Sequence, residues 1–94
     1  MVKVLNRKSE AVDFDVNRVI NAVMKAQSNL GKSHFDEALT IGMAVQDRYM
    51  NEEFVSIYDV ERMVEDLLMA KDPEVARMYI SHRAVSEAKR QKVL

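Results

Sequence analysis

The chain contains no cysteine and no tryptophan, and it has only one proline and two glycines. Without cysteine it can form no disulfide, no thiolate metal site and no cysteine nucleophile. So few helix breakers favour long helices. The sequence also lacks any long apolar run, and its first residues do not have the hydrophobic segment of a secretory signal. These absences predict a cytoplasmic protein without a membrane span.

An excess of charge of one sign is also missing, because 14 Lys and Arg stand against 15 Asp and Glu, for a net charge of −1. A nearly neutral chain has no global field that attracts nucleic acid or an anionic membrane, so any anion site has to be local. His34 and His82 lie far apart and have no partners at ligand spacing, which argues against a metal centre. The length and the apolar fraction of 48% suit one globular domain.

Two short segments near the start and one in the middle have the character of β-strands. Residues 2–6 alternate, with Val2 and Val4 on one face, and a basic turn at 7–9 leads to a return strand at 11–13. A β-rich run at 54–57 offers a third strand. These segments predict a small sheet of two to three strands.

Apolar residues at steps of three and four predict helices over most of the remaining chain. Four are expected, over about 16–30, 34–50, 58–70 and 73–92. Asp15 is the expected N-cap of the first helix and Gly31 its stop, and Ser33 is the expected N-cap of the second. Asp72 and Pro73 suit the N-cap and first turn of the fourth. The predicted fold class is α+β, mainly helical, with a four-helix bundle capped by the small sheet.

The residues that suit an anion site are gathered at the predicted hairpin turn and at the next helix start. Arg7 and Lys8 lie in the turn, where backbone N–H groups are exposed and an arginine fork fits phosphate. Arg18 lies in the first turn of the helix that follows, and a helix N-terminus favours anions. On this local pattern alone, solvated turn residues are the more common interpretation.

Other chemistry finds little support. Gly31-Lys32-Ser33 has the end of a P-loop motif, but Ala26 stands where that motif requires its first glycine. No Ser-His-Asp set or isolated carboxylate pair stands out from the scattered surface charge. The sequence therefore does not predict an enzyme.

Four segments, in the expected order, carry a resemblance to a known family. They are Val4–Ser9, Phe14–Val19, Ile57–Val60 and Ala76–Arg83. Together they resemble the ATP-cone, a regulatory nucleotide-binding domain found at the N-terminus of ribonucleotide reductases. The last segment is most similar to that of the anaerobic, glycyl-radical reductases. The resemblance implies that residues 1–94 form one ATP-cone domain.

The resemblance also implies a site for ATP or dATP, and leaves open whether Mg²⁺ accompanies the nucleotide. The implied phosphate-side residues are Asn6, Arg7, Lys8 and Arg18. Those implied for the base and sugar are Val4, Val12, Phe14, Asp15 and Val19. Ile57 and Val85 stand at further nucleotide-contact positions, and Asp59 and His82 at positions of the allosteric switch. No catalytic residue and no metal ligand is implied.

The chain departs from the family pattern at four of these positions. Asn6 replaces a lysine, Lys8 an aspartate and Ser9 a glycine, and Val85 stands where some members have a phosphate-binding lysine. Two hypotheses therefore stay open. The first is an allosteric ATP- or dATP-binding domain that controls the overall activity of a ribonucleotide reductase, with the catalytic domain as partner. The second is a degenerate cone that serves only as a helical interaction domain, for example in a homo-oligomer. Nucleic-acid binding is disfavoured by the neutral charge.

Overall fold

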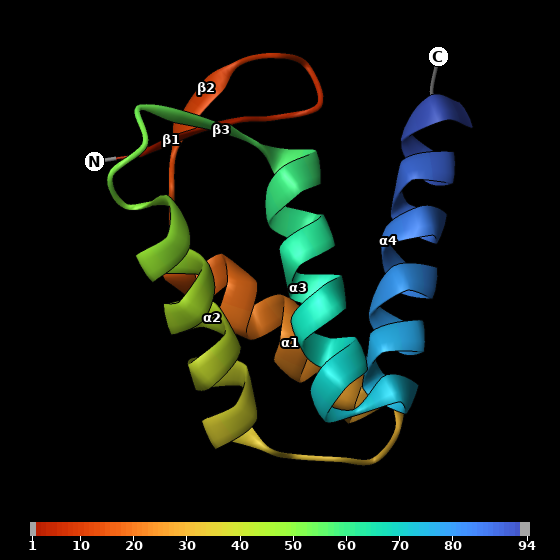
Figure 1. The fold of residues 1–94 in the computed structure, drawn as a ribbon. Helices are drawn as coiled ribbons and strands as arrows, with labels where there is room; N and C mark the ends of the chain where they lie inside the picture. The colour runs from red at the N-terminus through yellow and green to blue at the C-terminus, as the bar shows by residue number, and fades with distance from the viewer. Residues whose placement is uncertain (1, 93–94) are drawn as a thin grey trace.

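The computed structural model describes the backbone of residues 2–92 and the side chains of residues 2–84. Three short strands lie together at one end of the molecule, and four helices extend away from them (Figure 1). In chain order the elements are β1 Lys3–Leu5, β2 Ala11–Asp13, α1 Val16–Asn29, α2 Phe35–Tyr49, β3 Phe54–Ser56, α3 Ile57–Lys71 and α4 Pro73–Lys92. The predicted mainly helical α+β fold is confirmed.

The sheet has the strand order β2-β1-β3, with β1 antiparallel to β2 and parallel to β3. Val4 lies opposite Val12 on one side and Val55 on the other. Residues directly opposite each other share a face of a sheet, so these three valines form one row. Val4 and Val55 are buried in the core, which places the row on the helix-facing side. Val12, on the edge strand, is 39% exposed and forms the open end of the row.

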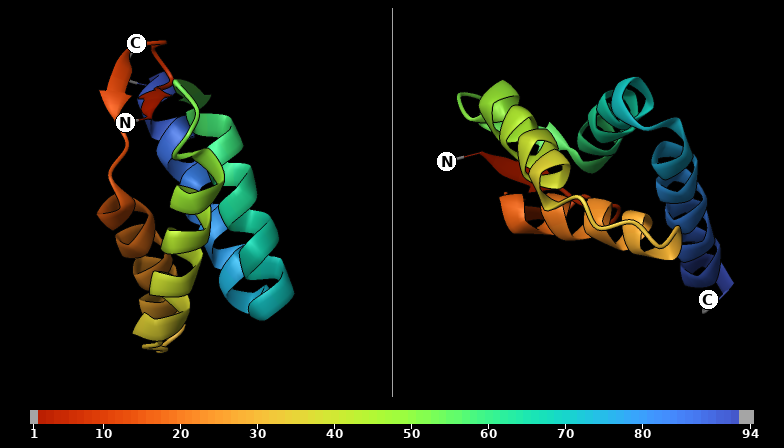
Figure 2. Two further views of the ribbon diagram at one scale, coloured as in Figure 1. Left: turned by 60° about the vertical axis from the view of Figure 1, so that its left-hand side comes forward. Right: turned by 90° about the horizontal axis from the view of Figure 1, so that it is seen from below.

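The four helices form a ring in which each helix packs against two others. α1 contacts α2 and α4, and α3 also contacts α2 and α4. Figure 2 shows this arrangement from the side and from the end opposite the sheet. Fully buried aliphatic side chains fill the centre, among them Val23, Ile41, Val64 and Leu68. No helix in the described part of the chain is long and apolar enough to cross a membrane.

Local capping chemistry explains most helix boundaries. The Asp15 carboxylate accepts a hydrogen bond of 2.9 Å from the Asn17 N–H at the start of α1. The Asp72 carboxylate accepts from the Val75 N–H at 3.5 Å at the start of α4. Gly31 follows the end of α1 with φ +70°, a left-handed conformation that glycine adopts without strain. These three predictions are confirmed.

The predicted cap of the second helix is wrong. α2 begins at Phe35, the preceding residue is His34 rather than Ser33, and no side chain caps the helix. Instead the buried Gln27 of α1 holds the loop, since its amide donates to the His34 carbonyl at 2.9 Å and accepts from the His34 N–H at 3.2 Å. A side chain seven residues earlier thus fixes where α2 starts.

The third helix also begins slightly earlier than predicted. α3 starts at Ile57, directly after β3, and the Ser56 hydroxyl accepts from the Tyr58 N–H at 3.2 Å. Because a cap side chain satisfies a backbone donor of the first turn, Ser56 ends the strand and opens the helix at once. The strand is therefore one residue shorter than the run at 54–57 predicted.

Candidate functional site

The turn between β1 and β2 is closed by the side chain of Asn6. Its carbonyl oxygen accepts from the N–H groups of Lys8 at 3.0 Å and Glu10 at 2.9 Å. The Asn6 N–H donates in turn to the Glu10 carbonyl at 2.9 Å. Ser9 takes a positive φ of 62° to complete the turn. Asn6 therefore shapes the loop that presents Arg7 and Lys8.

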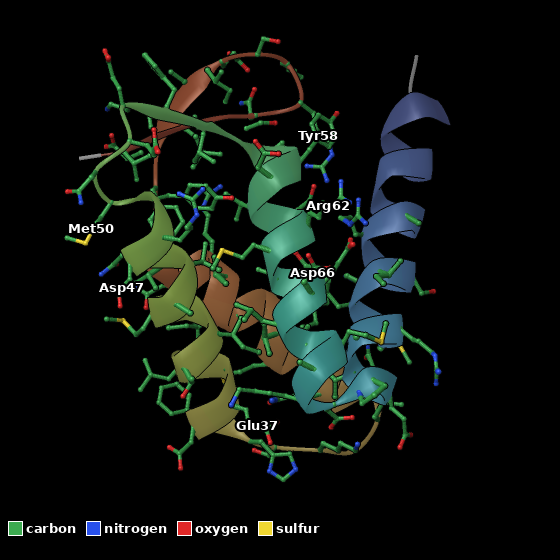
Figure 3. The ribbon with its side chains drawn as sticks, viewed as in Figure 1. Glu37, Asp47, Met50, Tyr58, Arg62 and Asp66 are labelled. Atoms are coloured by element: carbon green, nitrogen blue, oxygen red, sulfur yellow. The ribbon has the colours of Figure 1, made fainter. Side chains whose placement is uncertain are left out.

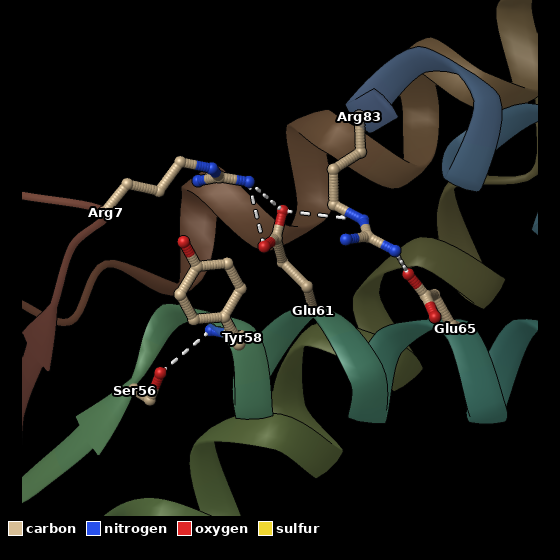
Figure 4. A network of polar contacts seen from close by, with 6 residues as sticks. All are labelled: Arg7, Ser56, Tyr58, Glu61, Glu65 and Arg83. Atoms are coloured by element: carbon tan, nitrogen blue, oxygen red, sulfur yellow. Dashed lines mark hydrogen bonds and ion pairs between the residues drawn. The ribbon is translucent and has the colours of Figure 1, made fainter. Parts of the chain in front are cut away.

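Arg7 reaches from this turn to α3. Its Nη2 donates to both carboxylate oxygens of Glu61, at 2.9 Å and 2.7 Å, and its guanidinium lies 5.7 Å from the centre of the Tyr58 ring (Figure 4). The N–H groups of a guanidinium bind carboxylate and phosphate oxygens alike. The structure thus holds Arg7 in an orientation that suits an oxyanion.

Glu61 receives a second cation from α4. Arg83 lies on the other side of the carboxylate, with its Nε 3.7 Å from Glu61 Oε2, and its Nη2 pairs with Glu65 one turn further along α3 (Figure 4). Glu61 is only 8% exposed. A buried carboxylate is costly unless it is paired, so both arginines stabilise its charge. Nearby, burial and then the Glu61 charge raise the pKa of the Tyr79 hydroxyl.

The start of α1 lies two residues beyond β2 and carries the next group of predicted residues. Lys8, Asp15 and Arg18 are exposed, and Asp15 is occupied as the N-cap. Phe14 is partly buried against the core and Val19 belongs to it. Residues 8–18 therefore contain exposed cations, the exposed end of the valine row at Val12 and the N-terminus of α1.

The predicted residues on α3 lie elsewhere. Ile57 packs against the core, whereas Asp59 lines a shallow pocket of about 260 Å³ beside β3. The pocket is lined by Leu5, Tyr49, Glu52, Phe54, Val55, Ser56 and Asp59. It contains two carboxylates and none of the cations of the hairpin, so its charge does not suit phosphate. We therefore place the candidate site at the hairpin and α1 rather than in this pocket.

The remaining two predicted residues lie on α4. His82 is exposed there, next to the network residue Arg83. Val85 lies in the helix, but its side chain is outside the described residues. Among the side chains that the structure describes, no group of three or more acidic or histidine ligands could hold a metal ion.

Glu61 and Tyr58 are the contacts that sequence reasoning missed. Figure 3 shows Tyr58 near the hairpin end of α3, followed along the helix by Arg62. Glu61 follows the buried Val60 and precedes Val64 by three residues, so helical spacing places a carboxylate beside the buried face. A carboxylate in that position needs a cation, and this signal could have found it.

The described groups suit the recognition of an anion. Arg7 is pre-oriented on an oxyanion, Lys8 and Arg18 are exposed, and exposed Val12 supplies apolar surface beside them. The two residues that replace family lysines, Asn6 and Val85, supply no charge.

Comparisons with known proteins identify the family of this chain. The family model described as the ATP cone domain matches residues 2–88. The anaerobic ribonucleoside-triphosphate reductase of Haemophilus influenzae (strain ATCC 51907 / DSM 11121 / KW20 / Rd) is 33% identical over 95% of this chain. The chain spans 13% of the length of that relative. The chain belongs to the ATP cone family of nucleotide-binding regulatory domains.

Proposed function

We propose that this chain binds ATP or dATP at the hairpin and the start of α1 and thereby regulates a ribonucleotide reductase of the anaerobic type. The observation that carries the proposal is Arg7, which is held at the hairpin turn with its Nη2 donating to both oxygens of the Glu61 carboxylate. The family match and the similarity to an anaerobic reductase support the assignment. All 94 residues act as one unit in this proposal, with the catalytic domain of the reductase as partner.

In the proposed site, Arg7, Lys8 and Arg18 bind the phosphates, with Mg²⁺ offsetting part of their charge. Val12 and the half-buried Phe14 supply the apolar surface for the base, and Val4 and Val19 support it from the core. In this proposal Asp15 accepts from a ribose hydroxyl in addition to capping α1. Asn6 contributes by holding the turn. No covalent step occurs, and regulation follows only if the nucleotide binds two states of the reductase with different affinity.

Calorimetric titration of the chain with ATP and with dATP, in the presence of Mg²⁺, tests the proposal. We expect micromolar binding of at least one nucleotide. Lys8→Ala combined with Arg18→Ala should abolish it without changing the fold, because both side chains are exposed and outside the Glu61 network. Arg77→Ala, at an exposed position on α4, is the matched control and should bind as the wild type does. Wild-type affinity in the double variant would place the site elsewhere.

A helical interaction domain without nucleotide is the second candidate. It is favoured by three large apolar side chains that lie four residues apart on the outer face of α2, namely Phe35, Leu39 and Met43. On this alternative the stripe mediates self-association with a second copy. Sedimentation equilibrium without nucleotide separates the two, because self-association that Met43→Glu abolishes, together with no heat of nucleotide binding, would favour it.

A further inference from the structure

Glu61 occupies the Nη2 group of Arg7, the arginine on which the proposed function depends. Both carboxylate oxygens accept from Arg7 Nη2, at 2.9 Å and 2.7 Å. A phosphate oxygen that approached Nη2 would need the same two N–H donors. Glu61 and a phosphate bound at this end of Arg7 therefore compete for Nη2.

The competition is costly for Glu61 because the carboxylate is buried. If Arg7 turned to a phosphate, Glu61 would retain only Arg83 as a close cation among the described residues. A buried charge that loses its partner destabilises a protein strongly. For the exchange to occur readily, another group has to take the place of Arg7.

Arg83 is placed to do so. Its Nε is buried and has no hydrogen-bond partner in the described part of the chain, and it lies 3.7 Å from Glu61 Oε2. Its Nη2 is meanwhile paired with Glu65. A movement of under about 1 Å would bring Nε within hydrogen-bond distance of Glu61 and satisfy both buried groups.

We propose that Glu61 is an internal competitor for the nucleotide phosphates, and that it sets the affinity of the site. When phosphate takes Arg7, Arg83 closes on Glu61, so a contact between the hairpin and α3 is exchanged for a tighter contact between α3 and α4. This inference rests on the proposed function, because it requires a phosphate at the hairpin. It gives the domain a direct connection from the nucleotide to the packing of α4.

The test is Glu61→Gln, which keeps the shape of the side chain and removes its charge. A neutral amide holds an arginine less strongly than a carboxylate does, so we expect ATP to bind about tenfold more tightly. Asp66→Asn is the matched control: it removes one carboxylate charge from α3 at an exposed position outside the Glu61 network. It should change the affinity less than about twofold, because solvent screens an exposed charge.

Inorganic tripolyphosphate should show the same gain in Glu61→Gln, because the competition concerns the phosphates alone. Circular dichroism establishes that each variant is folded, and Glu61→Asp, which shortens the side chain and weakens its reach to Arg7, replaces Glu61→Gln if that variant does not fold. Equal or weaker binding by the folded variant, while the wild type binds, would overturn this inference only. Failure of both wild type and variant to bind at millimolar nucleotide would overturn the proposed function itself.

Discussion

Gln27 connects the first two helices through the loop between them, and replacing it with methionine isolates that connection. The side chain is buried, and its amide exchanges two hydrogen bonds with the backbone of His34, at 2.9 Å and 3.2 Å. Methionine has a similar length and no amide. Gln27→Met therefore removes both hydrogen bonds while largely keeping the volume of the core.

The expected loss follows from these two hydrogen bonds. Each contributes about 0.5–1.5 kcal/mol to the free energy of unfolding, so Gln27→Met should cost about 1–3 kcal/mol. For a domain of this size, each 1 kcal/mol lowers the melting temperature by roughly 4–8 °C. The His34 carbonyl retains a hydrogen bond from the Ala38 N–H at 3.3 Å, which favours the lower half of the range.

Urea denaturation followed by circular dichroism measures this difference. Gln46→Met is the matched control, because Gln46 is a half-buried residue of α2 whose side chain makes no hydrogen bond in the described structure; it should change stability by less than about 0.5 kcal/mol. Hydrogen exchange at the His34 amide should also accelerate in Gln27→Met. A variant as stable as the wild type, with the His34 amide still protected, would refute the reasoning.

Three further substitutions test separate features of the fold. Gly42→Ala should lower stability by about 1–2 kcal/mol despite the better helix propensity of alanine, because the new Cβ would lie 2.7 Å from Ile20 Cγ1; unchanged urea stability would contradict this packing. Ser9→Gly should raise stability by roughly 0.5 kcal/mol, because glycine adopts the positive φ without strain, and a lower melting temperature would count against it. Asp72→Asn keeps the cap and loses the ion pair with Lys32. The hydrogen bond from Lys32 is the largest cause that lowers the pKa of Asp72 below its usual 3.8. The wild type should therefore be more stable than Asp72→Asn at neutral pH, and this difference in stability should shrink as the pH falls below about 4 through the folded-state pKa. A stability difference that is unchanged at pH 2 would refute this assignment.

The structural features that depend only on residues close together in the sequence could be predicted from the sequence. Asp15 and Asp72 cap their helices as expected, since a cap needs only a short side chain and the backbone N–H groups two or three residues later. The alternation of Val2 and Val4 likewise predicted which face of β1 is buried. These features follow from local chemistry, and tertiary contacts reinforce them.

The features that failed or were missed depend on contacts between distant residues. Ser33 has good capping chemistry, but the two hydrogen bonds of Gln27 to His34 fix the loop and α2 begins after His34. The pair between Arg7 and Glu61 joins residues 54 positions apart, and no local pattern identifies such a partner. The local pattern thus singled out Arg7, Lys8 and Arg18 and the resemblance implied the other site residues, whereas the charge that holds Arg7 required the fold.

The hydrogen bonds of the Asn6 side chain bear on which residues of the candidate site can bind phosphate. Its side chain accepts two backbone N–H groups and closes the turn, so the position contributes geometry where the family pattern has a cation. In the proposed site the phosphates depend on Lys8, Arg18 and Arg7, and Arg7 also donates to Glu61. On that proposal the competition for Arg7 concerns one of the three phosphate-binding cations. Neutralising Glu61 should therefore alter affinity more than adding one further exposed cation, because the first change removes a buried competitor and the second adds a charge that water and salt screen.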